Sequence, residues 1–339
     1  MSQAALSELL ARQGLYHPEY RGGLCNHLPM ALVALARMGA PADRLRLYAR
    51  LYERRLEPAP EGGKILPQEC WPQNLGRRRR YADFLATFQR AATERGLPQL
   101  LRDALPLLMP GCAAAAFHPL IRLGYALEAE AQREVAIALA YWAARHLSLG
   151  GTSGTEARPL SGDPEMLLSR LADDPTFNHR PDADSLIDAE MKRATVPEFA
   201  PVIDWLEIGP DSIRLLARAA LRLYAATGDF TALHMLTGMQ AVRLVLPYCE
   251  DRSAALRWIW QALAAAYLSI GKPPVPVHHS PGATNAPGWP EILNWTLEAD
   301  DEHVIKLVYS CWVEDRAYAD SLYRTVAVSM VRNQLSEAR

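Results

Sequence analysis

The sequence predicts an all-α protein, in which many helices form a bundle-like single large domain. Apolar residues recur at helical spacing along most of the chain, strand signals are scarce, and strands do not alternate with helices. Long loops rich in Pro and Gly separate the helical stretches. The 339 residues are 50% hydrophobic, which is enough to bury a large core. We therefore expect one domain over 1–339, and 150–185 is the best candidate for a division into two lobes.

In the first half of the chain, prolines and glycines mark where helices begin and end. Pro29, Pro98 and Pro119 each open a helix, because the N–H groups of a first turn have no intrahelical partner to lose. Gly39 and Pro41 close the helix that Pro29 opens. The run after Pro119 is long enough for two helices. The helices expected here span 2–13, 29–38, 45–55, 81–95, 98–108 and 119–147, with a loop over 57–76.

In the second half, the expected helices over 211–227, 230–248 and 252–270 follow one another closely. The first two are apolar on most sides, which predicts that they lie inside the helical assembly. Other helices of this half are expected over 164–171, 301–311 and 317–334. Two long loops complete it, a Gly-, Ser- and Thr-rich loop or lid over 150–163 and a Pro-rich loop over 272–290.

The composition excludes several classes of protein. The formal net charge is −2 and 22% of the residues are charged, so neither disorder nor a nucleic-acid partner is indicated. The basic run at 77–80 is expected on a solvated face, with contact to an anionic ligand as the alternative. No stretch approaches the roughly 20 apolar residues that cross a bilayer, and no signal-peptide pattern begins the chain. We therefore expect a soluble protein with no membrane partner.

The cysteines and the absent motifs narrow the chemistry further. Five widely spaced cysteines fit neither a disulfide framework nor a CxxC zinc site, and a reducing cytoplasm is the natural location. The chain has no GxGxxG after a strand, no GxxxxGK[ST] loop, no GxSxG elbow and no HExxH. An organic redox cofactor held by a familiar motif is therefore not expected. A metal ion assembled from distant residues remains as a candidate.

Four histidines occupy positions suited to metal ligands. His27 and His118 each lie just before a helix that a proline opens, so each imidazole is fixed near a rigid helix end with apolar neighbours. His234 lies inside an apolar helix, and His303 shares a helix face with Lys306, three positions on. Neutral imidazole is a good nitrogen ligand for iron, copper or zinc. For each of these histidines, a hydrogen-bonded core residue is the alternative.

Lys306 leads into an apolar stretch of its helix, and a lysine on the inner face there would be desolvated. Burial lowers the pKa of a lysine, and a neutral amine can add carbon dioxide to form an anionic carbamate ligand. A surface lysine that extends its ammonium to water is the alternative. Gly238, one turn after His234, is expected to leave space beside that imidazole.

The remaining histidines are weaker candidates. His17 is expected to line the site, and His278 and His279 are the replacements if one of the four ligands fails. His146 lies at the end of a long helix, where the helix dipole favours a cation, and His179 lies in a polar loop.

Several segments resemble the signatures of the questin oxidase-like family, in the expected order and over most of the chain. They are NHLPMALVALARMGA at 26–40, PGCAAAAFHPLIRLGYAL at 110–127, ALAYWA at 138–143, DFTALHMLTGMQAVR at 229–243 and DEHVIKLVYSCWV at 301–313. Fungal members are linked to oxidative ring opening of anthraquinones such as questin, described as a Baeyer–Villiger-type oxidation with NADPH. A member of the family resembles a non-haem iron dioxygenase that cleaves an anthraquinone C–C bond, with iron held by four histidines and a carboxylated lysine.

The resemblance implies a ligand set and a reaction for this chain. Matched by motif, the iron ligands would be His27, His118, His234, His303 and Lys306. Fe(II) would act with O2 on a small aromatic substrate, an anthraquinone-like polyketide, bound in a dry apolar pocket. The candidate walls are aromatic residues for which core packing is the alternative, namely Tyr141, Trp142, Tyr309 and Trp312.

Three other functions stay open at this point. One is an NADPH-dependent Baeyer–Villiger-type monooxygenase, although the sequence has no nucleotide-binding motif. Another is a hydrolytic or isomerising zinc enzyme, and the third is a non-catalytic helical binding protein. Both a monomer and a homodimer agree with the sequence.

Overall fold

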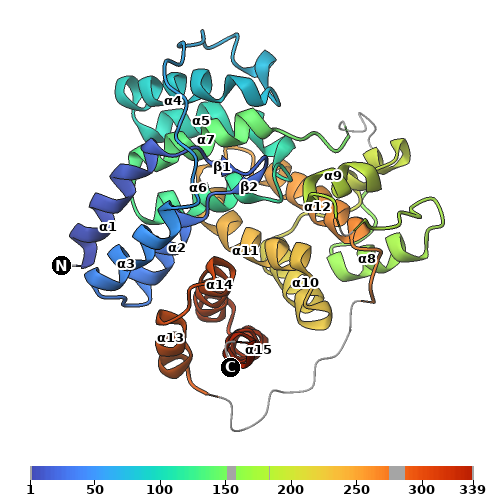
Figure 1. The fold of residues 1–339 in the computed structure, drawn as a ribbon. Helices are drawn as coiled ribbons and strands as arrows, with labels where there is room; N and C mark the ends of the chain where they lie inside the picture. The colour runs from blue at the N-terminus through green and yellow to red at the C-terminus, as the bar shows by residue number, and fades with distance from the viewer. Residues whose placement is uncertain (1, 151–157, 183, 275–286, 338–339) are drawn as a thin grey trace.

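The computed structural model describes residues 2–150, 158–182, 184–274 and 287–337 (Figure 1). Within these ranges nearly all regular structure is helical, which confirms the predicted all-α fold. The exception is a short antiparallel hairpin in which β1 (Glu19–Tyr20) pairs with β2 (Leu24–Cys25). Gly22 lies in its turn with a φ of 80°, a conformation that glycine adopts without strain. The hairpin leads directly into the first helix of the centre.

A group of packed helices forms the centre of the molecule (Figure 1). Helix α6 packs against α2, α7 and α11, and α14 packs against α2 and α11. Nearly every residue of α7 and α11 is buried, so these two helices have no solvent face. The bounds of the central helices are α2 (Leu28–Arg37), α6 (His118–Glu128), α7 (Gln132–Arg145), α11 (Phe230–Val245) and α14 (Glu302–Tyr318).

Other helices cover this centre on several sides (Figure 1). Helices α1 and α3 pack on α2, α4 and α5 pack on α7, α13 and α15 pack on α14, and α8 and α9 pack on α12. Their bounds are α1 (Ser2–Ala11), α3 (Ala42–Glu53), α4 (Tyr81–Arg95), α5 (Leu97–Leu108), α8 (Pro164–Asp173), α9 (Ile187–Ala194), α10 (Ser212–Thr227), α12 (Arg252–Ser269), α13 (Trp289–Leu297) and α15 (Leu322–Glu337). Short 3₁₀ turns are η1 (Arg12–Leu15), η2 (Pro72–Asn74), η3 (Arg78–Arg80), η4 (Met109–Gly111), η5 (Pro197–Asp204) and η6 (Leu246–Tyr248).

Most helix boundaries follow the sequence prediction, and the differences have physical reasons. Helix α14 continues to Tyr318 instead of ending at 311, because no breaker intervenes before Ala319 takes a left-handed conformation with φ 54°. Helix α15 accordingly begins at Leu322 and not at 317. Helix α9 and the turn η5 were not predicted, because the prolines around them indicate a loop.

The predicted loops are only partly described. The segment 57–76 is irregular apart from η2, and the expected loops over 150–163 and 272–290 include 151–157 and 275–286, which lie outside the described residues. Helix α13 begins at Trp289, inside the second of these expected loops. Among the described residues, no helix combines the length and the apolar character that a membrane span requires.

Candidate metal centre

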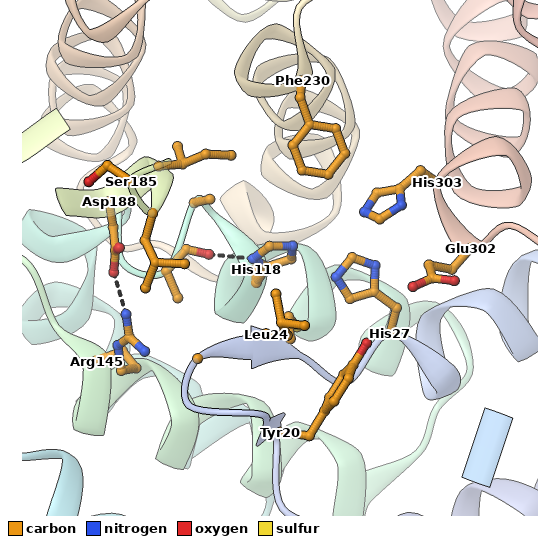
Figure 2. A pocket seen from close by; sticks show the side chains of 16 residues that line it. Tyr20, Leu24, His27, His118, Arg145, Ser185, Asp188, Phe230, Glu302 and His303 are labelled. Atoms are coloured by element: carbon orange, nitrogen blue, oxygen red, sulfur yellow. Dashed lines mark hydrogen bonds and ion pairs between the residues drawn. The ribbon is translucent and has the colours of Figure 1, made fainter. Parts of the chain in front are cut away.

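Four of the helices place a histidine in one small volume. The ring centroids of His27 and His118 are 4.7 Å apart, those of His27 and His303 also 4.7 Å, and those of His118 and His234 4.6 Å. The centroids of His234 and His303 are 5.8 Å apart. Figure 2 shows the rings of His27, His118 and His303 together beside a cavity. The structure thus brings together all four histidines that the sequence singled out.

Each imidazole is fixed by the start of a helix. His27 is the N-cap of α2 and His118 is the first residue of α6, and each is followed by a proline in the first turn. In α14, the N-cap carboxylate of Asp301 accepts the backbone N–H of His303 at 2.6 Å. His234 lies in the second turn of α11. Because helix N-termini carry a partial positive charge, their convergence favours an anionic group in the space between them.

The hydrogen bonds of two rings determine which nitrogen carries the proton. The Nδ1 of His234 contacts the Phe230 carbonyl at 2.7 Å, and the Nδ1 of His118 contacts the Ala115 carbonyl. A carbonyl oxygen only accepts, so Nδ1 is the donor in both rings and Nε2 carries the lone pair. Metal-ligating histidines are commonly held in this way.

The two lone pairs point at each other. His118 Nε2 and His234 Nε2 lie 3.0 Å apart, and with both Nδ1 atoms protonated neither nitrogen can donate to the other. Two nitrogen ligands of one metal ion, each at about 2.0–2.1 Å from it, would also lie close together. The contact is unfavourable for neutral imidazoles by themselves and favourable around a cation.

The other two histidines also present free nitrogens. His303 Nδ1 lies 3.3 Å from the Asp301 carboxylate, which fixes the ring and leaves Nε2 for the cluster. Neither His303 Nε2 nor His27 Nδ1 has a hydrogen-bond partner within the described part of the chain, although both atoms are buried. Buried polar atoms are rarely left in this state unless a water or an ion completes them.

Lys306 lies one turn after His303 and is fully buried. Its Nζ has no hydrogen-bond partner among the residues that the structure describes. Burial lowers the pKa of its ammonium group to about 8, so the neutral amine is accessible near physiological pH. The lysine is therefore not the surface residue of the alternative interpretation.

Burial also keeps the imidazoles neutral. It lowers the pKa of His27, His118 and His234 well below 6.5, and the charge of Lys306 and the neighbouring rings lower it further. Burial lowers the pKa of His303 as well, against the opposing effect of Asp301. Four neutral nitrogen donors and a lysine that can become a carbamate form a donor set that suits a divalent metal ion. Metal binding itself stays a prediction.

Two residues at the cluster were not predicted from the sequence. The ligand atoms of Cys25, His27 and His118 lie within 4.8 Å of one another, as do those of His27, Glu302 and His303. Burial raises the pKa of Cys25 to about 12, so its thiol is neutral. The only signal in the sequence was proximity, because Cys25 precedes His27 by two positions and Glu302 is adjacent to His303.

Glu302 belongs to a second polar network at the edge of the cluster. The Tyr52 hydroxyl donates to its carboxylate at 3.3 Å, and the Arg55 guanidinium lies 3.6 Å from it. The same Tyr52 oxygen accepts the backbone N–H of His27 at 3.1 Å. This network connects α3 to the starts of α2 and α14, so it supports two of the clustered histidines.

A cavity of about 210 Å³ opens beside the cluster (Figure 2). Phe230 lies at its edge, with its ring centroid 4.7 Å from that of His234 and 4.8 Å from that of His303. Phe230, Leu24 and Leu186 are 52%, 45% and 46% exposed, so large apolar side chains border the opening. The lining residues are Tyr20, Gly23, Leu24, Cys25, His27, Ala115, Ala116, His118, Arg145, Ser185, Leu186, Ile187, Asp188, Phe230, Glu302 and His303.

The aromatic residues named as candidate walls do not line this cavity, namely Tyr141, Trp142, Tyr309 and Trp312. Trp142 is fully buried and donates to the Gly111 carbonyl at 3.0 Å, and the Tyr141 hydroxyl donates to Glu19 at 3.2 Å. The rings of Tyr309 and Trp312 pack against each other. The core-packing alternative therefore holds for these four side chains.

Other candidates also differ from expectation. His17 contacts the backbone of Glu19 and lines a neighbouring cavity instead of this one. The atoms nearest to a Cβ at Gly238 would be those of Phe117, in ordinary van der Waals contact at 3.5 Å, so this glycine adjoins Phe117. His278 and His279 lie outside the described residues.

A family model described as questin oxidase-like matches residues 24–311. The match covers most of the chain and includes the four clustered histidines and Lys306. No curated protein matches the chain.

Proposed function

Because the chain belongs to the questin oxidase-like family, which implies an oxidoreductase acting on aromatic polyketides, we propose that it is a non-haem iron oxygenase that cleaves a C–C bond of an anthraquinone-like ring. The observation that carries this proposal is the pair of imidazoles whose Nε2 atoms face each other at 3.0 Å. Neither ring can satisfy the other, so the pair calls for a cation.

In this proposal the ion is held by His27, His118, His234, His303 and Lys306. Bound Fe(II) would supply the activation of dioxygen. The protein's part is to present neutral nitrogen ligands, and burial of the imidazoles supports that role. The backbone carbonyls of Ala115 and Phe230 hold two of the rings in the required tautomer.

Lys306 would contribute the anionic ligand. Its neutral amine attacks carbon dioxide, a C–N bond forms, and the proton leaves to solvent, so the product is a carbamate with one negative charge. Two features support the anion at this position. Four neutral imidazoles leave the charge of a divalent ion uncompensated, and the convergent helix N-termini stabilise negative charge.

The cavity beside the cluster suits a flat aromatic substrate. Its opening is bordered by Leu24, Leu186 and Phe230. A ligand that covers their exposed apolar surface removes that surface from water, which is favourable. Phe230 is near enough to His234 and His303 that a ring stacked on it would lie beside the cluster and exclude water. Such a substrate would be oriented by shape and apolar contact more than by charge.

Metal analysis of protein purified without oxygen tests the proposal. Wild-type protein should carry stoichiometric iron, and His118→Ala and His303→Ala should abolish it, whereas His179→Ala, outside the cluster, should retain it. Full iron retention in both cluster variants refutes the assignment. Zinc in place of iron would favour the hydrolytic or isomerising enzyme, and folded metal-free wild-type protein would favour a binding protein.

Oxygen uptake separates the two kinds of oxygenase. With an electron-rich hydroxyanthraquinone as substrate, a dioxygenase consumes oxygen without NADPH. A monooxygenase requires the nucleotide, so uptake that depends on NADPH would replace the proposed reaction by the Baeyer–Villiger-type one.

A further inference from the structure

The cavity has a second polar end, remote from the histidines. Arg145, Ser185 and Asp188 line it there. Figure 2 shows Arg145 and Asp188 on the side of His118 opposite His27 and His303. Arg145 ends α7 and Asp188 lies in the first turn of α9, so an ion pair between helices forms this end.

The charges at this end cancel. The Arg145 guanidinium pairs with both Glu19 and Asp188, and Glu19 also binds Arg78 at 2.8 Å. The side chains of Arg145, Glu19 and Asp188 are only 9%, 7% and 14% exposed, so solvent screens them little. Two guanidinium groups therefore face two carboxylates, and no positive charge is left over for a ligand.

This pairing determines which ligand groups are accepted. A hydroxyl group can accept from the Arg145 guanidinium and donate to the Asp188 carboxylate, and a carbonyl can accept from Arg145. A carboxylate can only accept, and it would be repelled by Asp188 without a net opposite charge to offset that repulsion. Apolar residues, among them Leu24, Ala115 and Ile187, also line the cavity.

From this arrangement we propose that Arg145 and Asp188 form a specificity-determining subsite that holds a neutral hydroxyl or carbonyl group at the far end of the substrate and rejects a carboxylate there. The proposal rests on the proposed function, since it takes this cavity as the substrate site. It adds a substrate class, namely a flat apolar body with its reacting ring at the histidines and a neutral hydrogen-bonding group at the other end.

A matched pair of ligands tests the subsite by binding alone. The probes are a hydroxyanthraquinone and the anthraquinone carboxylic acid substituted at the same position, titrated against iron-loaded protein without oxygen. Wild-type protein should bind the hydroxy compound more tightly by about tenfold, the change that about 1.4 kcal/mol produces. Asp188→Asn should remove or reverse the preference, because Arg145 then has charge to spare. Asp182→Asn, a 60% exposed residue outside the cavity lining, should leave it unchanged.

Three outcomes would overturn the subsite. They are equal or inverted affinities in wild-type protein, an equal shift of both affinities in Asp188→Asn, and no binding of either probe. The wild-type comparison stands even if the variant does not fold. Because Kd is measured without turnover, an absent ring-cleavage activity would reject the proposed reaction while leaving the ligand preference readable.

Discussion

Helix α6 carries two polar side chains one turn apart, the buried Arg122 and the partly buried His118, and they are partnered in opposite ways. Arg122 is 1% exposed and forms an ion pair at 2.9 Å with Glu134 of α7, itself 2% exposed. His118 meets the Nε2 of His234 with its own Nε2, so two groups of the same kind face each other. Around Arg122 the protein supplies the complementary charge, whereas around His118 it supplies another group of the same kind.

The difference separates structural from functional polar groups in this core. At the ion pair the fold supplies the opposite charge, although Arg122 Nη1 and Nη2 and one Glu134 oxygen have no hydrogen-bond partner among the described residues. The net contribution of such a buried pair to stability is small. At the cluster, the converging imidazole nitrogens and the Lys306 amine have no complementary group among the described residues, and the proposed ion would supply one. Substitutions that replace a cation by an apolar residue of similar size should therefore act with opposite signs at the two places.

The largest effect is expected at the ion pair. Arg122→Met leaves the Glu134 carboxylate buried without its partner, which should lower the free energy of unfolding by about 3–5 kcal/mol. Denaturant unfolding of metal-free protein measures the change. The double variant Arg122→Met/Glu134→Leu should recover most of the loss, because no uncompensated charge remains. A loss below about 1 kcal/mol in the single variant would show that Glu134 is readily solvated or protonated.

At the cluster, the same kind of substitution should stabilise the metal-free protein. Lys306→Met removes an unpartnered buried amine and should raise the free energy of unfolding by about 1–3 kcal/mol, while iron binding is lost. Denaturant unfolding and metal analysis of one preparation give both values. Lys192→Met, at an exposed lysine, should change stability by less than about 0.5 kcal/mol. If Lys306→Met instead lowers the free energy of unfolding, the contrast between the Arg122–Glu134 pair and the histidine cluster is wrong.

The sequence predicted the helices that carry the clustered histidines better than it predicted the lining of the cavity. Prolines and helical periodicity located α2, α11 and the starts of α6 and α14 to within a few residues, and their histidines were identified with them. The C-terminal ends of α6 and α14 were not located. Convergence itself could not be read from spacing, because it depends on how helices far apart in sequence pack. The family signatures supplied the candidate set, and the coordinates supplied the geometry.

The cavity walls were beyond sequence reasoning for a specific reason. Helix α7 is buried nearly all round, so its apolar pattern does not show which side faces a cavity. Tyr141 and Trp142 were candidate walls only because they are aromatic. The actual lining residues come from the β1–β2 hairpin, the last residue of α7, the start of α9 and the first residue of α11, among others. Since α9 was not predicted, neither Leu186 nor Asp188 was a candidate.

A smaller effect is expected at the exposed edge of the cluster. Phe230→Ala removes a half-exposed ring, so stability should change little, but a flat aromatic ligand should bind about tenfold more weakly. Iron content should stay at the wild-type value, which separates a substrate contact from a role in holding metal. Met166→Ala, at another exposed apolar residue, is the control. Unchanged affinity in Phe230→Ala would mean that the substrate does not approach across this ring.

The smallest effect is expected at His146, which tests whether one unpartnered imidazole resembles the cluster. Its Nε2 is buried without a hydrogen-bond partner, and no ring contact joins it to another histidine, among the described residues. Burial lowers the pKa of His146 below 6.5. As pH falls below about 6.5, His146 takes up a proton in the unfolded chain but stays neutral in the folded protein. The free energy of unfolding therefore keeps its full value above that pH and declines below it.

His146→Asn should therefore retain iron and lose less stability between pH 7.5 and pH 5.5 than wild-type protein does, by no more than about 1.4 kcal/mol per pH unit for one proton. Asparagine keeps a donor near the Leu107 carbonyl, which the imidazole contacts in the folded protein. Unfolding free energies at the two pH values, with iron content measured alongside, decide the matter. Loss of iron in the variant would mean that a single unpartnered imidazole affects metal binding as the four clustered imidazoles do. The contrast between Arg122 and His118 on α6 would then no longer identify a metal centre.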